Sequence, residues 1–249
     1  MINVILKIGF GSLGIIFLIF TLAFSSEKLS KVKCDELNVI IPEESARFID
    51  EDEVIRLVKK ADPTLFENTL DKVNTNLLEQ KLRKTPAIKN VEVFRHISGE
   101  RMDFKGHLVV EVIQREPLLR VVSGQDDYYM DASGVRIPAN PQFTAHVMLI
   151  TGRVDEDFVR QQLIPLVSFV NDDNLWKAQI KQIEVASSGE LTMIPLVGEQ
   201  LIEFGDANEY QEKFRNLKAL YVQAFNKFGW DKYKKVSLKY KDQVVCTKR

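Results

Sequence analysis

The sequence predicts an α+β protein with one N-terminal transmembrane helix, a small α+β module and a larger β-rich domain with helices packed on its sheet. An uncharged apolar stretch near the start predicts the membrane helix. Two helical patterns enclosed by β-rich runs predict the module, and many short strand patterns predict the second domain. The expected boundaries are 1–7 for a short cytoplasmic tail, 8–25 for the membrane helix, 33–115 for the module and 116–249 for the β-rich domain.

The composition is that of an ordinary globular protein, which limits the classes of function. The chain has 249 residues, of which 45% are hydrophobic and 28% charged, and a formal net charge of -1. A dedicated nucleic-acid binder needs a strongly basic domain or stripe to neutralise phosphates. Nucleic acid is therefore not an expected partner.

The expected membrane helix is the stretch IGFGSLGIIFLIFTLAF, from Ile8 to Phe24, which carries no charge. Its length is about the minimum for a helix that crosses a hydrocarbon core of ~30 Å. A cleaved signal peptide is the alternative, since Thr21-Leu22-Ala23 offers a small residue at a suitable place, but an apolar region of this length favours a retained anchor. Lysines flank both sides, so charge leaves the orientation open.

The module is predicted from strands and helices in the order strand, helix, helix, strand, strand. Residues 37–41 form the first strand, and Asp50 caps a helix in which Glu53 is the reciprocal capping-box acid. A second helix runs from Thr75 to Lys84, with Leu77, Leu78 and Leu82 as its apolar stripe. The remaining strands are 91–97 and 108–113, joined by a polar, glycine-containing loop.

The second domain is predicted to contain mostly short strands. A helix from about Asp155 to Val170 is bent or split at Pro165, and another runs from Ala207 to Phe228 with Gly229 as its C-cap. The strand patterns lie at 119–122, 128–130, 135–137, 147–151, 180–185, 191–194 and 200–204, and the chain closes with a strand from Val236, a Lys-Asp-Gln turn and a final strand to Cys246.

The stretch YYMDASGVRIP, residues 128–138, combines strand residues with a turn signal. Asp131 suits the first position of a type I turn and Gly134 suits the left-handed position that completes a hairpin. Both are therefore predicted to be structural turn residues. The alternative is a carboxylate-based hydrolase that uses Asp131 together with Asp126 or Asp127.

No metal site, cofactor site or catalytic residue is predicted elsewhere. His96, His107 and His146 are the only histidines, and they lack metal-binding spacing, although the first two could face each other across a hairpin. Phosphate-binding loops, dinucleotide-binding glycines and nucleophile elbows are absent from the sequence. Cys34 and Cys246 could form a disulfide or serve as small apolar strand residues.

The C-terminal segment is basic. Lysines on a terminal strand protect an exposed sheet edge, but such an edge also accepts a strand from a partner, and sequence leaves both interpretations open. Between Lys227 and Arg249 only Asp231 and Asp242 oppose Lys227, Lys232, Lys234, Lys235, Lys239, Lys241, Lys248 and Arg249.

The order of short motifs behind one predicted span resembles the FtsQ/DivIB family of bacterial cell-division proteins, in a form similar to that of Bacteroidetes-type bacteria. In that family the first module is a POTRA domain, whose last strand enters a β domain through an Arg-x-Pro-like segment. The motifs that carry the resemblance are FIDEDEV at 48–54, PAIKNVEVFR at 86–95, VEVIQREPLLRV at 110–121, YYMDASGVRIP and the closing VSLKYKDQVV.

The resemblance implies a non-enzymatic divisome scaffold that links septal cell-division proteins. It implies a single-pass inner-membrane protein with a periplasmic C-terminal domain, enriched at the division septum. Its partners would be bitopic division proteins of the FtsB and FtsL type and, indirectly, the septal peptidoglycan synthesis machinery. The partner-binding residues that the resemblance implies lie on the terminal hairpin: Val236, Leu238, Tyr240, Val244, Val245 and Thr247.

Two departures from the family pattern concern this hairpin. Lys241, Asp242 and Gln243 stand where the family has small residues, and Thr247-Lys248-Arg249 replaces a large aromatic residue near the end. The specificity of the surface is therefore expected to differ. A POTRA-bearing secretion or envelope-assembly protein is an alternative function, and it is expected to carry tandem POTRA modules or a barrel.

Overall fold

The computed structural model describes residues 15–21, 31–100, 103–225, 229 and 232–249. Most of the expected membrane helix, residues 8–14 and 22–25, lies outside these ranges. Residues 15–21 are helical, with exposed apolar side chains. Within the described ranges, no helix combines the length and the apolar character needed to cross a membrane.

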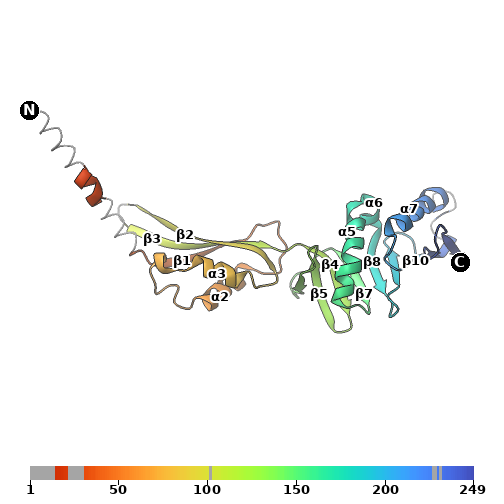
Figure 1. Cartoon of the computed structure of the whole chain (residues 1–249), viewed down its shortest axis with the longest axis horizontal. Coiled ribbons are helices and arrows are strands. Elements are labelled where there is room, and N and C mark those ends of the chain that lie inside the picture. Colours follow the sequence, from red (N-terminus) through yellow and green to blue (C-terminus); the bar gives the residue numbers. More distant parts are fainter. Residues whose placement is uncertain (1–14, 22–30, 101–102, 226–228, 230–231) are drawn as a thin grey trace, which may run out of the picture. The chain divides into compact units, whose positions relative to one another are not determined.

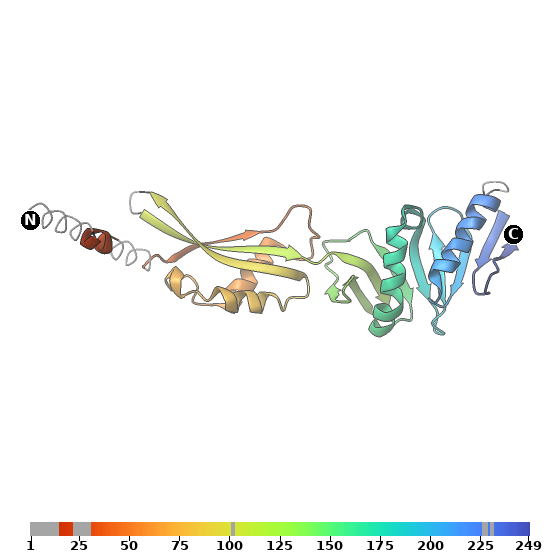
Figure 2. The same ribbon diagram turned by 45° about the horizontal axis from the view of Figure 1, so that its top comes forward.

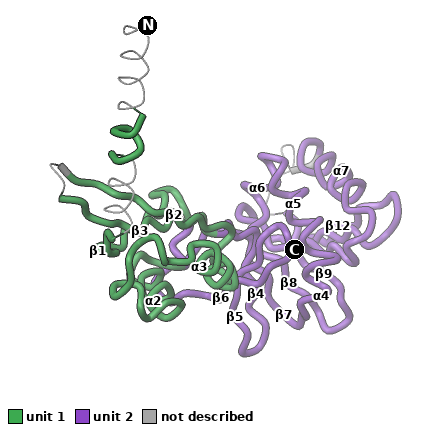
Figure 3. Tube along the Cα trace, turned by 60° about the vertical axis from the view of Figure 1, so that its left-hand side comes forward, with its two compact units in different colours: residues 1–45, 49–114 green, residues 46–48, 115–249 purple. Residues whose placement is uncertain are grey.

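The chain divides into two compact units (Figure 3), and the division confirms the predicted α+β class with a small module and a β-rich domain. Unit 1 contains residues up to Ser45 and Ile49–Gln114, whereas unit 2 contains Ala46–Phe48 and Arg115–Arg249.

Unit 1 is a three-stranded sheet in the order β1-β3-β2 with two helices packed on it (Figure 1). Its β1 pairs parallel with β3, and β2 pairs antiparallel with β3. The helices bury Val54, Val58, Leu78 and Leu82 against the sheet. Along the chain the elements are β1 (Cys34–Ile40), α2 (Glu51–Ala61), the 3-10 turn η1 (Leu70–Lys72), α3 (Thr75–Leu82), β2 (Ile88–Glu100) and β3 (Asp103–Gln114).

The helix starts of unit 1 follow local capping, with two corrections. Asp50 Oδ1 accepts the Glu53 backbone N–H at 2.8 Å, as an N-cap does. The Glu53 carboxylate, however, pairs with Arg56 three residues on rather than completing the reciprocal capping box. Leu77 is 44% exposed, so the predicted apolar stripe of α3 was wrong at that position.

Unit 2 contains one nine-stranded sheet in the order β12-β11-β10-β9-β8-β7-β4-β5-β6. The pairs β4/β7, β7/β8 and β10/β11 are parallel and the others antiparallel. The strands are β4 (Pro117–Ser123), β5 (Asp126–Asp131), β6 (Arg136–Pro138), β7 (Met148–Gly152), β8 (Ile180–Val185), β9 (Leu191–Pro195), β10 (Leu201–Gly205), β11 (Tyr233–Ser237) and β12 (Val245–Lys248).

Helices cover one face of this sheet (Figures 1 and 2). Phe214 of α7 (Tyr210–Leu220) lies 4.9 Å from Trp176 of α6 (Asn174–Gln179) and 5.5 Å from Phe169 of α5 (Ile164–Asp172), measured between ring centroids. Phe204 of β10 is 5.3 Å from the same ring. An aromatic cluster therefore joins the helices to the sheet and contributes apolar burial and ring contacts to the core of unit 2.

In unit 2 the helix around Pro165 is split, as predicted, whereas the number of helices and their ends differ from the prediction. The predicted helix around Pro165 is α4 (Glu156–Phe158), a π-helical turn η2 (Val159–Leu163) and α5. Because proline has no N–H, the wider turn accommodates its position at the start of α5. The sequence did not predict α6, and α7 continues as the π-helical turn η3 (Tyr221–Phe225). Gly229, the expected C-cap, has a φ of 89°, but residues 226–228 lie outside the described ranges.

Candidate partner-binding edge

The C-terminal strand β12 forms one end of the nine-stranded sheet. Across the described residues it pairs only with β11, antiparallel, with Ser237 opposite Val245 and Lys235 opposite Thr247. No other described strand lies on its outer side, so alternate N–H and C=O groups on that side face outward. Val245 is 44% exposed, and Thr247 is also exposed. The strand offers the geometry that a partner strand needs for main-chain pairing.

The six predicted contact residues fall into two groups. Val236 and Leu238 are buried in the core, so their side chains support the edge and are not available for direct contact. Val244 is half-buried against the same core. Tyr240, Val245 and Thr247 are exposed, and their side chains are the ones that a partner could reach.

Tyr240 was expected in a strand but lies in the turn between β11 and β12. β11 ends at Ser237, and the Gln243 N–H donates to the Tyr240 carbonyl at 3.3 Å to close the turn. Asp242 in this turn has a φ of 57°, a left-handed conformation that is uncommon for a residue other than glycine. The Tyr240 side chain is 59% exposed and sits beside the edge strand instead of on it.

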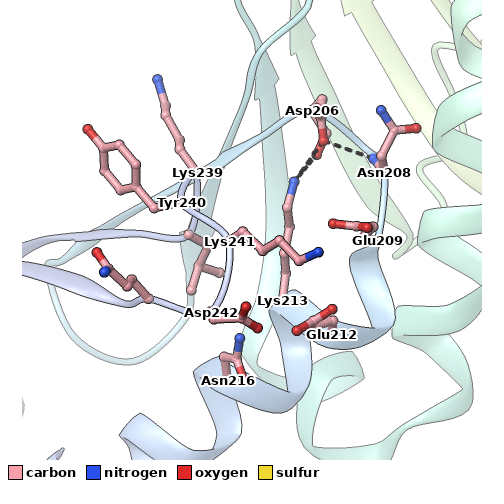
Figure 4. A pocket seen from close by; sticks show the side chains of 12 residues that line it. Asp206, Asn208, Glu209, Glu212, Lys213, Asn216, Lys239, Tyr240, Lys241 and Asp242 are labelled. Carbon is pink, nitrogen blue, oxygen red and sulfur yellow. Dashed lines mark hydrogen bonds and ion pairs between the residues drawn. The ribbon is translucent and has the colours of Figure 1, made fainter.

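A hollow of about 130 Å³ separates this turn from the start of α7 (Figure 4). The Lys213 ammonium spans its inner side and donates to both the carboxylate and the carbonyl of Asp206 at 2.8 Å. That ammonium holds the pKa of Asp206 below its usual range. Glu209, just before α7, has a φ of 51°, so left-handed residues border the hollow on two sides. Acidic residues and lysines both line the hollow, so its lining does not have a single sign of charge.

The basic character of the edge is reduced by ion pairs with neighbouring segments. The Lys235 ammonium lies 2.8 Å from the Glu203 carboxylate, and the Lys239 ammonium lies 2.8 Å from that of Glu190. The bond to Glu190 raises the pKa of Lys239. Arg249 pairs with Glu199 at 2.5 Å. Since these side chains are partly exposed, such pairs contribute little stability, but they remove charge from the cluster that the sequence suggested.

The Asp131 carboxylate is held by hydrogen bonds within its own turn and by an ion pair with Arg115. Its Oδ1 accepts the Ser133 and Val135 backbone N–H groups at 2.9 Å, and its Oδ2 accepts from Arg115 at 2.8 Å. Burial raises the pKa of Asp131, but the hydrogen bonds from Ser133, Val135 and Arg115 outweigh it, so the net pKa lies below its usual range. The Gly134 N–H donates to the Asp131 carbonyl at 3.0 Å. Every one of these contacts holds the turn, and Gly134 takes a φ of 80°.

The histidines of unit 1 form a link that sequence analysis missed. His96 and His107 do face each other, with ring centroids 5.9 Å apart. His107 Nε2 lies 2.7 Å from Ser98 Oγ, and its Nδ1 lies 3.1 Å from the Glu36 carboxylate. A nucleophilic triad has the same order of groups, but its acid is buried, whereas the Glu36 side chain is 59% exposed. We interpret the series Glu36, His107 and Ser98 as a structural link between the neighbouring strands β1, β3 and β2.

The described residues contain no metal-binding cluster, and neither cysteine forms a disulfide. No cluster of three or more potential ligands occurs among the described histidines, cysteines and acids. Cys34 lies in β1 of unit 1 and Cys246 in β12 of unit 2, and both are free. Burial raises the pKa of each thiol. Of the two alternatives that the sequence left open, the disulfide is not formed, and small apolar strand residues describe the positions of Cys34 and Cys246.

Two protein-family models match the chain. The model described as FtsQ/DivIB, C-terminal related, matches residues 116–247, which include the whole nine-stranded sheet except its last residue. The model described as POTRA-like domain matches residues 32–100 in unit 1. Neither describes an enzyme. No curated protein matches the chain.

Proposed function

This chain belongs to the family described as FtsQ/DivIB, C-terminal related, and from that membership we propose that it is a non-enzymatic divisome scaffold. It links septal division proteins at the inner membrane through its C-terminal domain. The observation that carries the proposal is the open edge of β12 within the region that matches the family.

The edge binds its partner by strand addition. An extended segment of the partner pairs with the outward N–H and C=O groups of β12 and extends the sheet by one strand. The main-chain bonds supply affinity, and the exposed side chains of Tyr240, Val245 and Thr247 select the partner. The buried Val236 and Leu238 hold β11 in place behind the edge. Bitopic proteins of the FtsB and FtsL type are the proposed partners.

The proposed location follows from the first stretch of the sequence. Residues 8–25 anchor the chain in the inner membrane as a single span, and residues 1–7 form a short cytoplasmic tail. The two units then lie in the periplasm, and partners concentrate the protein at the septum. Septal peptidoglycan synthesis is affected indirectly, through the proteins that the scaffold gathers.

Depletion of the protein in its own cell, alongside a functional fluorescent fusion, tests the role. Loss of a divisome scaffold is expected to give filaments with unfinished septa, and the fusion is expected to form a band at mid-cell. Normal division together with an even membrane signal would contradict the proposal.

The binding edge is tested by co-purification of the full chain with its bitopic partners. Along β12, successive backbone N–H groups point in turn toward β11 and toward the open side. Of the variants Val245→Pro and Cys246→Pro, one therefore removes an N–H that faces β11 and the other removes an N–H that faces outward. The variant that removes an outward N–H is expected to lose the partner, as is Tyr240→Lys. Val222→Lys is the matched control, because Val222 is 61% exposed but lies off the edge. Retention of the partner by all three edge variants would exclude β12 as the interface.

A further inference from the structure

A second hollow, of about 440 Å³, lies inside unit 2 at the N-terminal ends of β4, β7 and β8. It is separated from β12 by three strands in the sheet order, so it is distinct from the edge described above. Its volume is within the range of about 300–1,000 Å³ that ligand pockets occupy. The lining residues are Pro117, Leu118, His146, Val147, Met148, Asn171, Lys177, Ile180 and Lys181.

The charged residues of this lining are both lysines, Lys177 and Lys181. His146, Lys177 and Lys181 are exposed at the hollow, and the lining contains no aspartate or glutamate. Glu116 and Asp172 are the sequence neighbours of lining residues, but neither lines the hollow. A concave surface with cations and no carboxylate attracts anions more strongly than scattered surface lysines do.

These lysines differ from the lysines of unit 2 that are paired with a carboxylate. Lys213, Lys218 and Lys235 each form an ion pair with a carboxylate. In the described part of the chain, no carboxylate lies within ion-pair distance of Lys177 or Lys181. The Lys181 ammonium instead donates to the Lys177 carbonyl at 2.6 Å, which orients it and leaves its other N–H groups for a ligand.

The apolar part of the site indicates what the anion is attached to. Pro117, Leu118 and Met148 form part of the wall. Next to it, the loop after β9 exposes 64% of Leu196 and 50% of Val197. The Leu196 N–H donates to the Gln179 carbonyl at 2.6 Å, which places this apolar loop beside the end of α6. A free inorganic ion would leave these apolar surfaces unused.

From this combination we propose that the hollow is a carboxylate-binding site for an acidic, partly apolar peptide segment of another protein. The lysines bind Asp or Glu side chains, and the apolar wall and loop bind the residues between them. A bilayer is a flat surface and fills a concave site poorly, so a peptide is favoured over anionic lipid. The site gives the protein a second interaction surface, independent of strand addition at β12.

The test is a titration of the full chain with an eight-residue peptide of alternating Glu and Leu. NMR chemical shifts of the protein's backbone amides are the readout. Peptide-induced shifts are expected at backbone amides of β4, β7 and β8. Binding is expected to be at least tenfold weaker in Lys177→Glu/Lys181→Glu, and a peptide with Gln in place of Glu is expected not to bind. Lys234→Glu is the matched control, since Lys234 is an exposed lysine on β11. Unchanged shifts across the rest of unit 2 show that the double variant is folded.

Three outcomes would overturn the proposal. Equal binding of the Glu and Gln peptides would show that charge is not recognised. Equal competition by inorganic phosphate would show that the apolar wall contributes nothing. Binding of the wild type, but not of the double variant, to phosphatidylglycerol vesicles without a response to the peptide would assign the lysines to a membrane surface. Because none of these readouts involves β12 or cell division, they are independent of the scaffold role.

Discussion

The two edge strands of the nine-stranded sheet, β6 and β12, differ in how well they are protected against pairing with a further strand. At one end, β6 buries Ile137 and finishes at Pro138, which has no N–H to offer a further strand. At the other end, β12 exposes Val245 and Thr247. The β6 end is protected against further pairing, whereas the β12 end presents an extendable edge.

The contacts behind the β6 end explain its closure. Arg136 lies 3.0 Å from Asp126 and 2.8 Å from Glu156, and its guanidinium stacks 4.1 Å above the Tyr128 ring. The Asn140 side chain, just beyond β6, donates to the Phe48 carbonyl at 3.3 Å, which is a further contact at this end of the sheet. An edge with so many specific contacts is expected to serve stability, whereas the β12 edge is expected to serve binding.

Asp131→Ala is the change expected to have the largest effect on stability. It removes the turn hydrogen bonds that the carboxylate accepts and leaves the Arg115 guanidinium, 20% exposed, without its partner. Breaking such a pair is expected to lower the free energy of unfolding of unit 2 by about 3 kcal/mol. Urea denaturation measures it. Asp127→Ala is the control, with a loss of about 1 kcal/mol or less for an exposed pair. Equal losses in both variants would contradict the assignment.

Lowering the pH is expected to remove the stabilisation that the Asp131 carboxylate gives to unit 2, without a mutation. The net pKa of Asp131 in the folded chain lies below its usual range, because hydrogen bonds to the carboxylate outweigh the effect of burial. The stabilisation is therefore complete above the unfolded pKa of about 4 and is lost as pH falls through the lower folded pKa. Unfolding measured between neutral pH and strong acid should show this loss, and Asp131→Asn should show a smaller one. An identical pH profile in the variant would refute the linkage.

Arg136→Ala is expected to have an intermediate effect. The side chain is 40% exposed, so solvent screens its two ion pairs, and the contact with Tyr128 contributes as well. We expect a loss of about 1 kcal/mol. Thermal denaturation compared with Arg153→Ala, which changes an exposed arginine on the loop after β7, isolates the contribution. A loss no greater than in that control would mean that Arg136 does not close the β6 end.

Tyr240→Lys is expected to have the smallest effect on stability and a large effect on binding. The side chain is 59% exposed, and surface changes of this kind stay within about 0.5 kcal/mol. Partner affinity is nevertheless expected to fall at least tenfold. Calorimetric melting and partner titration on the same sample separate the two quantities. A large drop in stability would show that the β12 end, like the β6 end, is a structural edge.

Much of the fold could be predicted because its signals are local. Asp50 at the start of α2 and the Pro165 interruption act within a few residues, and alternating apolar residues predicted most strands. The short helix α6 was missed because six residues carry too little periodic pattern, although Asp173 caps it. The exposure of Leu77 was missed because the width of an apolar stripe depends on the surface against which the helix packs.

Sequence by itself determined the turn chemistry of this protein, since Asp131 and Gly134 need only neighbouring backbone groups to adopt their conformations. Only the tertiary structure decided which side chains form the candidate site. Residues distant in sequence bury Val236 and Leu238 and leave Tyr240 exposed in the turn. The same applies to charge, because Lys235 and Lys239 find carboxylates on other segments while Lys177 and Lys181 find none in the described chain. Strand order and register set those distances, and both depend on contacts that no local pattern encodes.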